Sequence, residues 1–307
     1  MFLLPPSVWF PFPMQSLPRP PVVMTFSASD PTAGAGLQAD LLACVSMGCH
    51  AVTVVTGVTV QDTAGVESVE AIDAELLEDQ ARLLLEDTVV DCFKVGLLCH
   101  VENIQAVAEI AADYPDTPMV LDPVLASGRG DNITNEDQRA ALCELLLPQT
   151  TVLTPNSLEA RQLAHQLLEN AQVSMERAQQ TLTEEAFSTL PLAVCAEAIL
   201  ASGCEYVLIT GTHEPGQEVI NTLYGPAGLV QEFRYQRLPA SYHGSGCTLA
   251  SALAALLAAG LAIPDAVKEA QEYTWQTLSH GFQLGMGQPI PDRLFWARQR
   301  PASHPAN

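Results

Sequence analysis

Short β-branched runs alternate with longer helical patterns along most of this chain, and this alternation constrains its fold more than any other feature. The runs at 22–26, 51–58, 92–97, 119–124, 151–154 and 206–210 predict buried parallel strands. Helical patterns lie between or after them at 37–47, 74–85, 104–112, 136–147 and 265–281. Residues 222–224 and 230–237 flank a Gly-Pro pair and predict a hairpin at one edge. We expect an α/β fold, with an open, mostly parallel sheet and helices on both faces.

No linker divides the chain, so we expect one domain at 22–285, between a flexible N-terminal extension at 1–21 and a C-terminal tail at 286–307. The extension has no basic region before its short apolar part, which argues against a secretory signal. Residues 247–264 reach the length of a membrane span, but their Ala, Thr, Ser and Gly favour a buried helix. Residues 171–188 are polar and predict a solvated helical insertion.

The charge balance excludes several classes of partner. With 13 basic and 35 acidic side chains, the formal net charge is −22, which disfavours nucleic acid and anionic membranes. An anionic substrate would need backbone dipoles, a metal ion or a few local cations. The eight cysteines form no CxxC pair and no zinc spacing, so we expect reduced thiols in a cytoplasmic protein.

Ligands of open α/β sheets bind beyond the carboxyl ends of the strands, and polar residues follow several of the predicted strands. Asp30 and Gly34 lie in a glycine-containing turn that leaves amides free, although a plain turn would look the same. Gln61 follows the second strand and suits the edge of a heterocyclic base, or belongs to a polar loop tip.

Carboxylates follow two later strands. Asp122 comes directly after a buried run, where a carboxylate is costly unless it is paired or binds a metal. Asn156 and Glu159 lie one helical turn apart after the next run. They are candidate ligands, or a helix cap with its partner.

The strongest local motif is His243-Gly244-Ser245-Gly246-Cys247-Thr248, directly before the alanine-rich helix. Two glycines and a helix N-terminus direct several free N–H groups to one point, which can hold a phosphate during transfer. The helix dipole is expected to favour the Cys247 thiolate. An esterase elbow is excluded, because His243 and Cys247 stand where its glycines belong. A cysteine hydrolase that uses Cys247 with a histidine remains an alternative.

Taken together and in this order, the motifs resemble the hydroxymethylpyrimidine/phosphomethylpyrimidine kinases of thiamine biosynthesis, in the ribokinase-like superfamily. They lie at 27–40, 58–65, 94–96, 121–131, 153–159, 208–213 and 243–248, and the resemblance covers roughly 22–285. It implies a ribokinase-like fold and the use of ATP and Mg²⁺. It also implies phosphorylation of 4-amino-5-hydroxymethyl-2-methylpyrimidine and then of its monophosphate. The habit of the family suggests a homodimer.

The resemblance also implies roles for individual residues. Substrate binding falls to Asp30, Gly34, Gln61 and Lys94. The catalytic anion hole falls to Gly244, Ser245, Gly246 and Cys247, with Cys247 where relatives carry the base. Nucleotide binding falls to Asn156, Glu159, Thr210 and Gly211, and the metal to Asp122 and Glu159.

Two departures from the family pattern each remove an expected cation. Thr210-Gly211-Thr212-His213 stands where the family commonly has Lys-Gly-Gly-His, and Gly128 stands in place of a lysine. They bear most on the second phosphorylation, whose acceptor is already anionic. Lys94 and Arg129 are candidates to compensate, and a structural charge is the alternative role for Lys94.

Two further functions stay open. A pyridoxal kinase would use the same fold on another aromatic alcohol, although Gln61 and the Ser29-Asp30-Pro31 opening favour the pyrimidine. A non-catalytic relative that binds the pyrimidine is supported by the missing lysine at 210.

Overall fold

The structure is a computed structural model, and it describes residues 19–125, 133–174 and 189–298, with side chains of α5 described up to residue 169. Three predictions fall outside the described residues: most of the N-terminal extension, the pair Gly128 and Arg129, and most of the polar insertion at 171–188. Residues 171–174 form the end of a helix.

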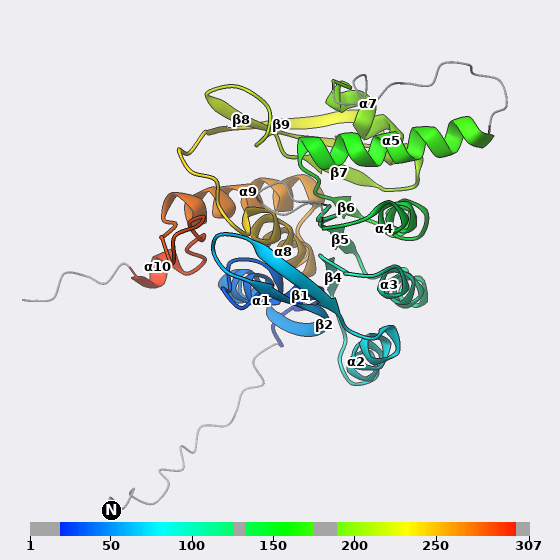
Figure 1. The fold of residues 1–307 in the computed structure, drawn as a ribbon, viewed down its shortest axis with the longest axis horizontal. Helices are drawn as coiled ribbons and strands as arrows, with labels where there is room; N and C mark the ends of the chain where they lie inside the picture. Colours follow the sequence, from blue (N-terminus) through cyan, green and yellow to red (C-terminus); the bar gives the residue numbers. More distant parts are fainter. Residues whose placement is uncertain (1–18, 126–132, 175–188, 299–307) are drawn as a thin grey trace, which may run out of the picture.

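The described residues form a sheet of nine strands in the order β3-β2-β1-β4-β5-β6-β7-β8-β9 (Figure 1). The strands are β1 (Val22–Ser29), β2 (His50–Gln61), β3 (Val66–Ala71), β4 (Cys92–Val95), β5 (Met119–Leu121), β6 (Val152–Leu153), β7 (Tyr206–Ile209), β8 (Glu218–Gly225) and β9 (Gly228–Gln236). Neighbours from β2 to β7 pair in parallel, whereas β3, β8 and β9 pair antiparallel. The open, mostly parallel sheet is confirmed.

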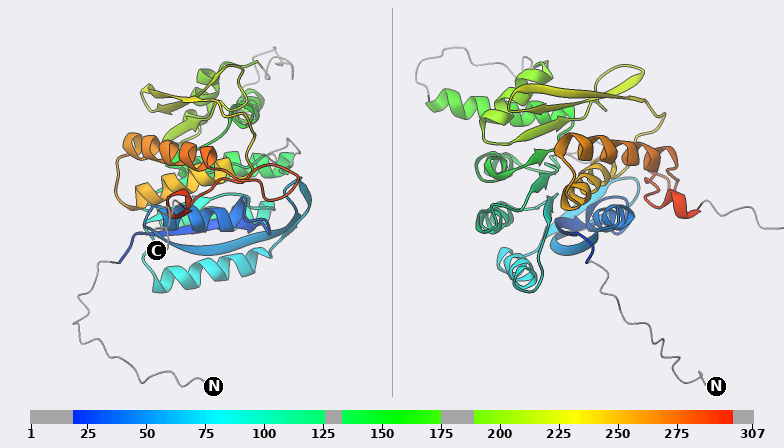
Figure 2. Two further views of the ribbon diagram at one scale, coloured as in Figure 1. Left: turned by 90° about the vertical axis from the view of Figure 1, so that its left-hand side faces the viewer. Right: turned by 180° about the vertical axis from the view of Figure 1, so that it is seen from behind.

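Helices cover both faces of the sheet, as predicted (Figure 2). One face carries α2 (Ala74–Asp87), α3 (Val101–Asp113), α4 (Glu136–Ala141), α5 (Ser157–Ser174) and α7 (Leu192–Ala201). The other carries α1 (Gly36–Ser46), α8 (Ser245–Ala258) and α9 (Ile263–Ser279), and a short helix α10 (Phe295–Arg298) follows. Each face has its own apolar core, because the central strands are buried on both sides.

The alanine-rich helix α8 is buried, as predicted from its composition. Its residues from Thr248 to Leu256 are all buried, and it packs between α1 and α9. Small side chains allow this close approach of three helices. No helix among the described residues is long and apolar enough to cross a membrane.

Three local predictions need correction. Edge strand β3 was not predicted, because its alternating residues are half-exposed on both faces and leave little hydrophobic periodicity. Strands β4 and β5 end at Val95 and Leu121, two and three residues earlier than expected. The helix expected at 136–147 is α-helical only to Ala141 and continues as a π-turn (Leu142–Leu146) and a 3₁₀ turn (Leu147–Gln149) that contains a proline.

The expected domain boundary at residue 285 is also wrong. Residues Ile290, Asp292 and Arg293 are buried, and the backbone of Phe282 pairs with that of Ile290. The N–H of Asp292 donates to the carbonyl of Thr277 in α9. Residues 286–298 therefore pack with the domain, and the rest of the expected tail, 299–307, lies outside the described residues.

The strand order determines where a ligand can bind. From β1, the chain moves to β2 on one side and later to β4 on the other, so the connections leave β1 in opposite directions. This reversal opens a crevice beyond the carboxyl ends of β1 and β4. The turn after β1 carries the first of the predicted site motifs.

Candidate active site

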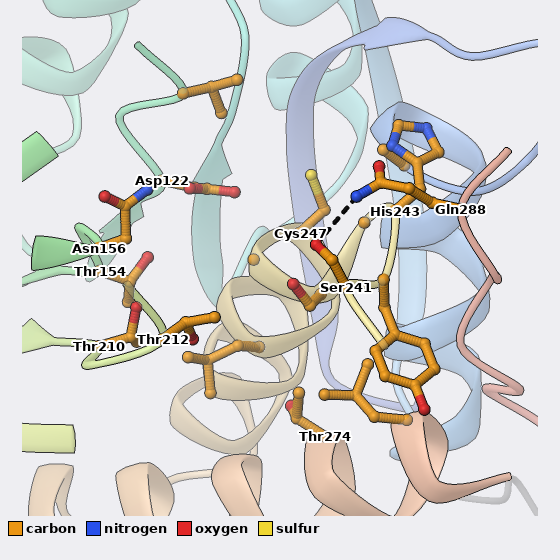
Figure 3. Close-up of a pocket in the computed structure, with 18 of the residues that line it drawn as sticks. Asp122, Thr154, Asn156, Thr210, Thr212, Ser241, His243, Cys247, Thr274 and Gln288 are labelled. Atoms are coloured by element: carbon orange, nitrogen blue, oxygen red, sulfur yellow. Dashed lines mark hydrogen bonds between the residues drawn. The ribbon is translucent and has the colours of Figure 1, made fainter. Parts of the chain in front are cut away.

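A pocket of about 550 Å³ opens beyond the carboxyl ends of the parallel strands, at this crevice. Figure 3 shows Asp122, Thr154, Asn156 and Thr210 on one side of it and Cys247, His243, Ser241 and Gln288 on the other. Of the residues predicted for the site, it brings together Asp30, Gln61, Asp122, Asn156, Glu159, Thr210, Gly244, Ser245, Gly246 and Cys247. Gly34, Lys94 and Gly211 do not line it.

Asp30 organises the turn that follows β1. Its carboxylate accepts hydrogen bonds from the N–H and hydroxyl of Thr32 and from the N–H of Ala35. It also lies 2.8 Å from His243 Nε2. Burial alone raises the pKa of Asp30, but these hydrogen bonds, that of His243 foremost, lower it to about 2. Asp30 is therefore ionised, and it ties the first loop of the site to the glycine motif.

The glycine motif forms the corner at which helix α8 begins. Gly244 is the N-cap with φ of 85°, and a Cβ on it would lie 1.8 Å from the carbonyl oxygen of Gly34. Only glycine fits this close crossing of two backbone segments. The carbonyl of Gly244 accepts from the N–H of Thr248, so the N–H groups of Ser245, Gly246 and Cys247 precede the first helical hydrogen bond. We call these three amides the anion hole.

Cys247 and Asp122 both line the pocket, from opposite sides of it (Figure 3). Burial raises the pKa of the Cys247 thiol to about 12, and the charge of Asp122 adds to this effect. The expectation that the helix dipole favours a thiolate is therefore wrong, because desolvation outweighs it at this position. Burial likewise raises the pKa of Asp122, to about 6, even with the charge of Lys94 acting in the opposite direction.

Asn156 and Glu159 form a reciprocal cap at the start of α5, the simpler of the two readings of this motif. The side-chain oxygen of Asn156 accepts from the N–H of Glu159, whose carboxylate accepts from the N–H of Asn156. The second oxygen of Glu159 accepts from the N–H of Leu125. Burial and the charge of Asp122 raise the pKa of Glu159 to about 7. Two buried carboxylates thus repel each other at the wall of the pocket.

This pair of carboxylates fits a magnesium ion better than a transition metal. The described residues contain no cluster of three His, Cys, Asp or Glu side chains that could hold a metal. Mg²⁺ keeps several waters and is usually bound through one or two carboxylates together with substrate phosphates. Asp122 has the most available oxygens, since both oxygens of Glu159 already accept backbone hydrogen bonds.

Lys94 lies beneath the pocket and not on its wall. Its side chain is fully buried, and its ammonium group donates to Asp40 and to the hydroxyl of Ser27 at 2.9 and 3.1 Å. A second hydroxyl, from Ser251 of α8, donates to Asp40. Lys94 does not line the pocket, and its contacts favour the structural alternative, a buried ion pair that joins β4, α1 and α8.

The side of the pocket near β7 carries a polar network behind Thr210. The N–H of Gly211 donates to the side-chain oxygen of Asn221, whose amide donates to Gln271 of α9. Arg237 donates to the carbonyls of Thr212, Glu214, Gly216 and Glu218 and so fixes the loop after Thr210. Arg237 also lines the pocket, close to the position where the family lysine is missing.

Gln61 ends β2 at the opposite side of the pocket, next to a loop that another segment holds in place. The carbonyl of Thr63 accepts from the N–H of Gln288, and the Thr63 hydroxyl accepts from the N–H of Gly287. The side chain of Gln288 donates to Ser241. Residues 285–293, which we call the C-terminal strap, therefore contact the loop after β2 as well as the segment before the glycine motif.

Sequence reasoning missed three features near this site. They are the pairing of His243 with Asp30, the position of Arg237, and the position of Arg293. Arg293 donates to backbone carbonyls on both sides of the glycine corner. These partners lie far apart in the chain, and no spacing rule connects them. The sequence offered one indirect indication: a glycine motif suited to anions, in a chain with few basic residues, suggests that a basic side chain from elsewhere in the chain lies near it.

Solved structures of kinases share this fold. The ADP complex of Bacillus subtilis pyridoxal kinase has a TM-score of 0.77 at 25% identity and covers 91% of this chain and 100% of that chain. The phosphomethylpyrimidine kinase of Clostridium difficile has a TM-score of 0.66 at 27% identity, covering 84% and 99%. The fold that the chain shares with these kinases defines a small-molecule phosphotransferase of the ribokinase-like class.

Sequence comparison gives the family within this class. A family model described as phosphomethylpyrimidine kinase matches residues 30–291. The chain is 36% identical over 269 residues to the hydroxymethylpyrimidine/phosphomethylpyrimidine kinase of Streptomyces coelicolor, covering 87% of this chain and 92% of that protein. The chain belongs to the phosphomethylpyrimidine kinase family.

Proposed function

We propose that this protein transfers the γ-phosphoryl group of ATP to the hydroxymethyl group of 4-amino-5-hydroxymethyl-2-methylpyrimidine, and then phosphorylates the monophosphate. The observation that carries this proposal is the anion hole of Ser245, Gly246 and Cys247, which opens into the same pocket as Gln61 and Thr210. Gln61 lies on the acceptor side and Thr210 on the nucleotide side. Phosphate would thus pass between the two substrates at the N-terminus of α8.

The chemistry of such a transfer requires little from a base. Its transition state is loose, so alignment and charge stabilisation dominate the rate. The Cys247 thiol, with a pKa of about 12, is protonated at neutral pH. We expect Asp122, with a pKa of about 6, to be the group that accepts a proton or binds the cation.

Magnesium is part of the proposal. Asp122 would hold it, with Glu159 reaching it through water, because the oxygens of Glu159 are bound to backbone N–H groups. When bound, the ion neutralises charge on the phosphates of the nucleotide. It would also relieve the repulsion between these two buried carboxylates.

The missing lysine at 210 leaves the nucleotide side with another source of charge. Arg237 lines the pocket beside Thr212, and its hydrogen-bond partners among the described residues are all backbone carbonyls. Its positive charge is therefore not neutralised by a carboxylate in contact with it among the described residues. We propose that Arg237 compensates for the lysine in both phosphorylation steps.

Pyridoxal kinase activity is the second candidate, and one observation favours it. The structures most similar in shape include a Staphylococcus aureus pyridoxal kinase in complex with AMP-PCP and pyridoxal, with a TM-score of 0.74. Gln61 and the sequence relatives favour the pyrimidine. The two alcohols share an aromatic ring with a hydroxymethyl substituent, so a single pocket could admit both.

A coupled assay of ADP release tests these proposals. We expect turnover with ATP, Mg²⁺ and the pyrimidine alcohol, slower turnover with its monophosphate, and weak turnover with pyridoxal. Gln61→Leu is the matched variant, and it should raise KM for the pyrimidine by ~10-fold while leaving KM for ATP unchanged. Faster turnover with pyridoxal would replace the proposal by its alternative. Binding of the pyrimidine without ADP release would support a non-catalytic relative.

Two further proposals concern the whole protein. All eight cysteines are free thiols, which supports a location in the reducing cytoplasm. A homodimer is supported by apolar side chains exposed on α1, Leu41 and Val45, beside the exposed Trp296 that donates to Ser46. Light scattering of the purified protein would test the dimer directly.

A further inference from the structure

Arg293 lies behind the glycine corner, on the C-terminal strap. It is only 3% exposed. Its guanidinium donates to the carbonyls of Ala33 and Gly244 at 3.2 and 3.3 Å, to the carbonyl of Gly34 and, through Nε, to the hydroxyl of Thr248 at 3.0 Å. One side chain therefore joins the loop after β1 to the first turn of α8.

These contacts fix the direction of the anion hole. The carbonyl of Gly244 accepts from Arg293 and from both the N–H and the hydroxyl of Thr248. In a planar trans peptide the C=O and the following N–H point in opposite directions. Holding the carbonyl of Gly244 toward Arg293 thus aims the N–H of Ser245 away from it, toward the pocket.

The corner would be unfavourable without a cation. The carbonyl oxygens of Ala33, Gly34 and Gly244 all approach one guanidinium, and the backbones of Gly34 and Gly244 pass in direct contact. Without the arginine, the carbonyls of Ala33 and Gly34 would lose this donor in a buried space, and the carbonyl of Gly244 would keep only its hydrogen bonds from Thr248. The planar fork of arginine satisfies several acceptors at once, which a lysine cannot do.

The guanidinium of Arg293 has no direct ion-pair partner among the described residues, although the charges of Asp30 and Asp40 act on it from a greater distance. Among the described residues, no carboxylate forms an ion pair with it within 4.0 Å. Burial lowers the pKa of Arg293, but an arginine starts so high that it stays charged at neutral pH. In a poorly solvated site, such a charge acts on the adjacent pocket more strongly than a surface charge would.

The backbone of Arg293 is itself anchored. Its carbonyl accepts from the hydroxyl of Tyr273 at 3.0 Å, and the N–H of the preceding Asp292 donates to Thr277. Both partners lie on α9, which packs against α8. The guanidinium is therefore held in place by the fold and does not depend on a bound ligand.

We infer that Arg293 is a positioning residue for phosphoryl transfer: it aims the amides of residues 245–247 into the pocket and adds a positive charge behind them. It does not touch the reactants. The inference rests on the proposed function, and it explains how a chain with a net charge of −22 binds phosphate without the family lysine at 210.

Three variants test this role through steady-state kinetics. Arg293→Met should lower kcat by ~100-fold to ~1000-fold, the loss seen when a charge-stabilising donor is removed, with both KM values changed by less than about threefold. Arg293→Lys keeps the positive charge but not the planar guanidinium, so its kcat should lie between those of the wild type and of Arg293→Met. Arg298→Met, in the neighbouring helix α10, is the control, because Arg298 is exposed and among the described residues contacts Asp292 and Phe282; it should match the wild type. Unchanged kcat in Arg293→Met would overturn the inference.

Amide hydrogen exchange of the free protein gives a second measurement that needs no substrate. We expect the amide of Thr248, whose hydrogen bond to Gly244 closes the first turn of α8, to exchange at least about tenfold faster in Arg293→Met than in the wild type or in Arg298→Met, with strands β4 and β5 unchanged. Equal exchange at Thr248, or faster exchange throughout, would overturn the inference even if activity is lost. A wild-type protein without kinase activity would refute the proposed function, and a localised effect of Arg293 on exchange would still support its positioning role.

Discussion

Asp122 and Glu159 are two buried carboxylates on the same wall of the pocket, and their protonation depends on whether a cation is bound there. Burial raises the pKa of Asp122 to about 6, and burial together with the charge of Asp122 raises that of Glu159 to about 7. A folded-state pKa above the unfolded value means that stability falls as pH rises through this range. A bound cation reverses this penalty, so ligand binding and protonation compete at one place.

The pH dependence of the reaction should reveal this competition. We expect kcat/KM to rise as the pH passes about 6, because Asp122 must lose its proton. Raising the Mg²⁺ concentration should move this limb to lower pH, because the cation favours the ionised form. The measurement is a pH profile of ADP release at two Mg²⁺ concentrations. Asp122→Asn should be slow and lack the limb; if the limb persists in that variant, it belongs to another group.

Residue types at the strand ends could be predicted from the sequence, whereas their partners could not. Asp30, Gln61, Asp122 and Thr210 follow apolar runs, so their place at the rim follows from the chain order. The partner of Asp30 is His243, 213 residues away. Whether a charge is paired decides its role, and pairing depends on tertiary structure. For this reason the sequence left Lys94 open between a structural and a binding role.

The proposed function depends most on the turn that leads into α8. Its two glycines, Gly244 and Gly246, are needed for different physical reasons. At Gly244, φ is 85° and a Cβ would overlap the carbonyl oxygen of Gly34. At Gly246, a Cβ would lie 3.6 Å from Asp122, an ordinary contact that faces the pocket. One glycine is required by the backbone and the other by the space for a ligand.

Substitutions should separate these two reasons. Gly244→Ala should lower the free energy of unfolding by roughly 3 kcal/mol, because it combines strain with a backbone clash. Gly246→Val should keep the fold but reduce kcat at least ~100-fold by filling the pocket. Thermal unfolding and ADP release measure the two effects. Gly260→Ala, at a positive φ with open space around it, is the control and should cost only about 1 kcal/mol.

Elements with strong periodicity were predictable, and weak or remote ones were not. Apolar runs in the sequence predict the parallel strands and the buried helix α8. Strand β3 is a half-exposed edge, and the strap at 285–293 has no periodic structure at all. The strap acts through single backbone hydrogen bonds to Thr63 and His243, which leave no pattern in composition. A segment of this kind reads as a tail until its contacts are seen.

The whole molecule carries a net charge of −22, whereas the proposed function requires it to bind an anionic nucleotide. The net charge would repel a nucleotide at long range, and under the proposal the anion hole, Arg237 and Arg293 attract it at short range. The long-range repulsion therefore lowers the rate of association, whereas the short-range attraction raises the affinity of the bound nucleotide. Salt screens the long-range field most, because the Debye length is only about 10 Å at 0.1 M.

We therefore expect salt to help this enzyme at first. Between about 10 and 100 mM KCl, kcat/KM for ATP should rise several-fold, because screening removes repulsion before it weakens contacts inside the pocket. The value for the uncharged pyrimidine alcohol should hardly change, which makes it the internal control. Steady falling of the ATP value over the same range would show that attraction already dominates at the surface.

The C-terminal strap is synthesised after all the strands of the sheet, and this order has a consequence for how the protein matures. The sheet strands and α8 emerge from the ribosome before Arg293, so the nascent chain can collapse around its cores while the loops of the site still lack their fastener. Under the proposed role of Arg293, catalytic competence would be acquired as one of the final steps of maturation. A chain cut short near residue 285 would then keep its two apolar cores but lose most of its phosphoryl transfer.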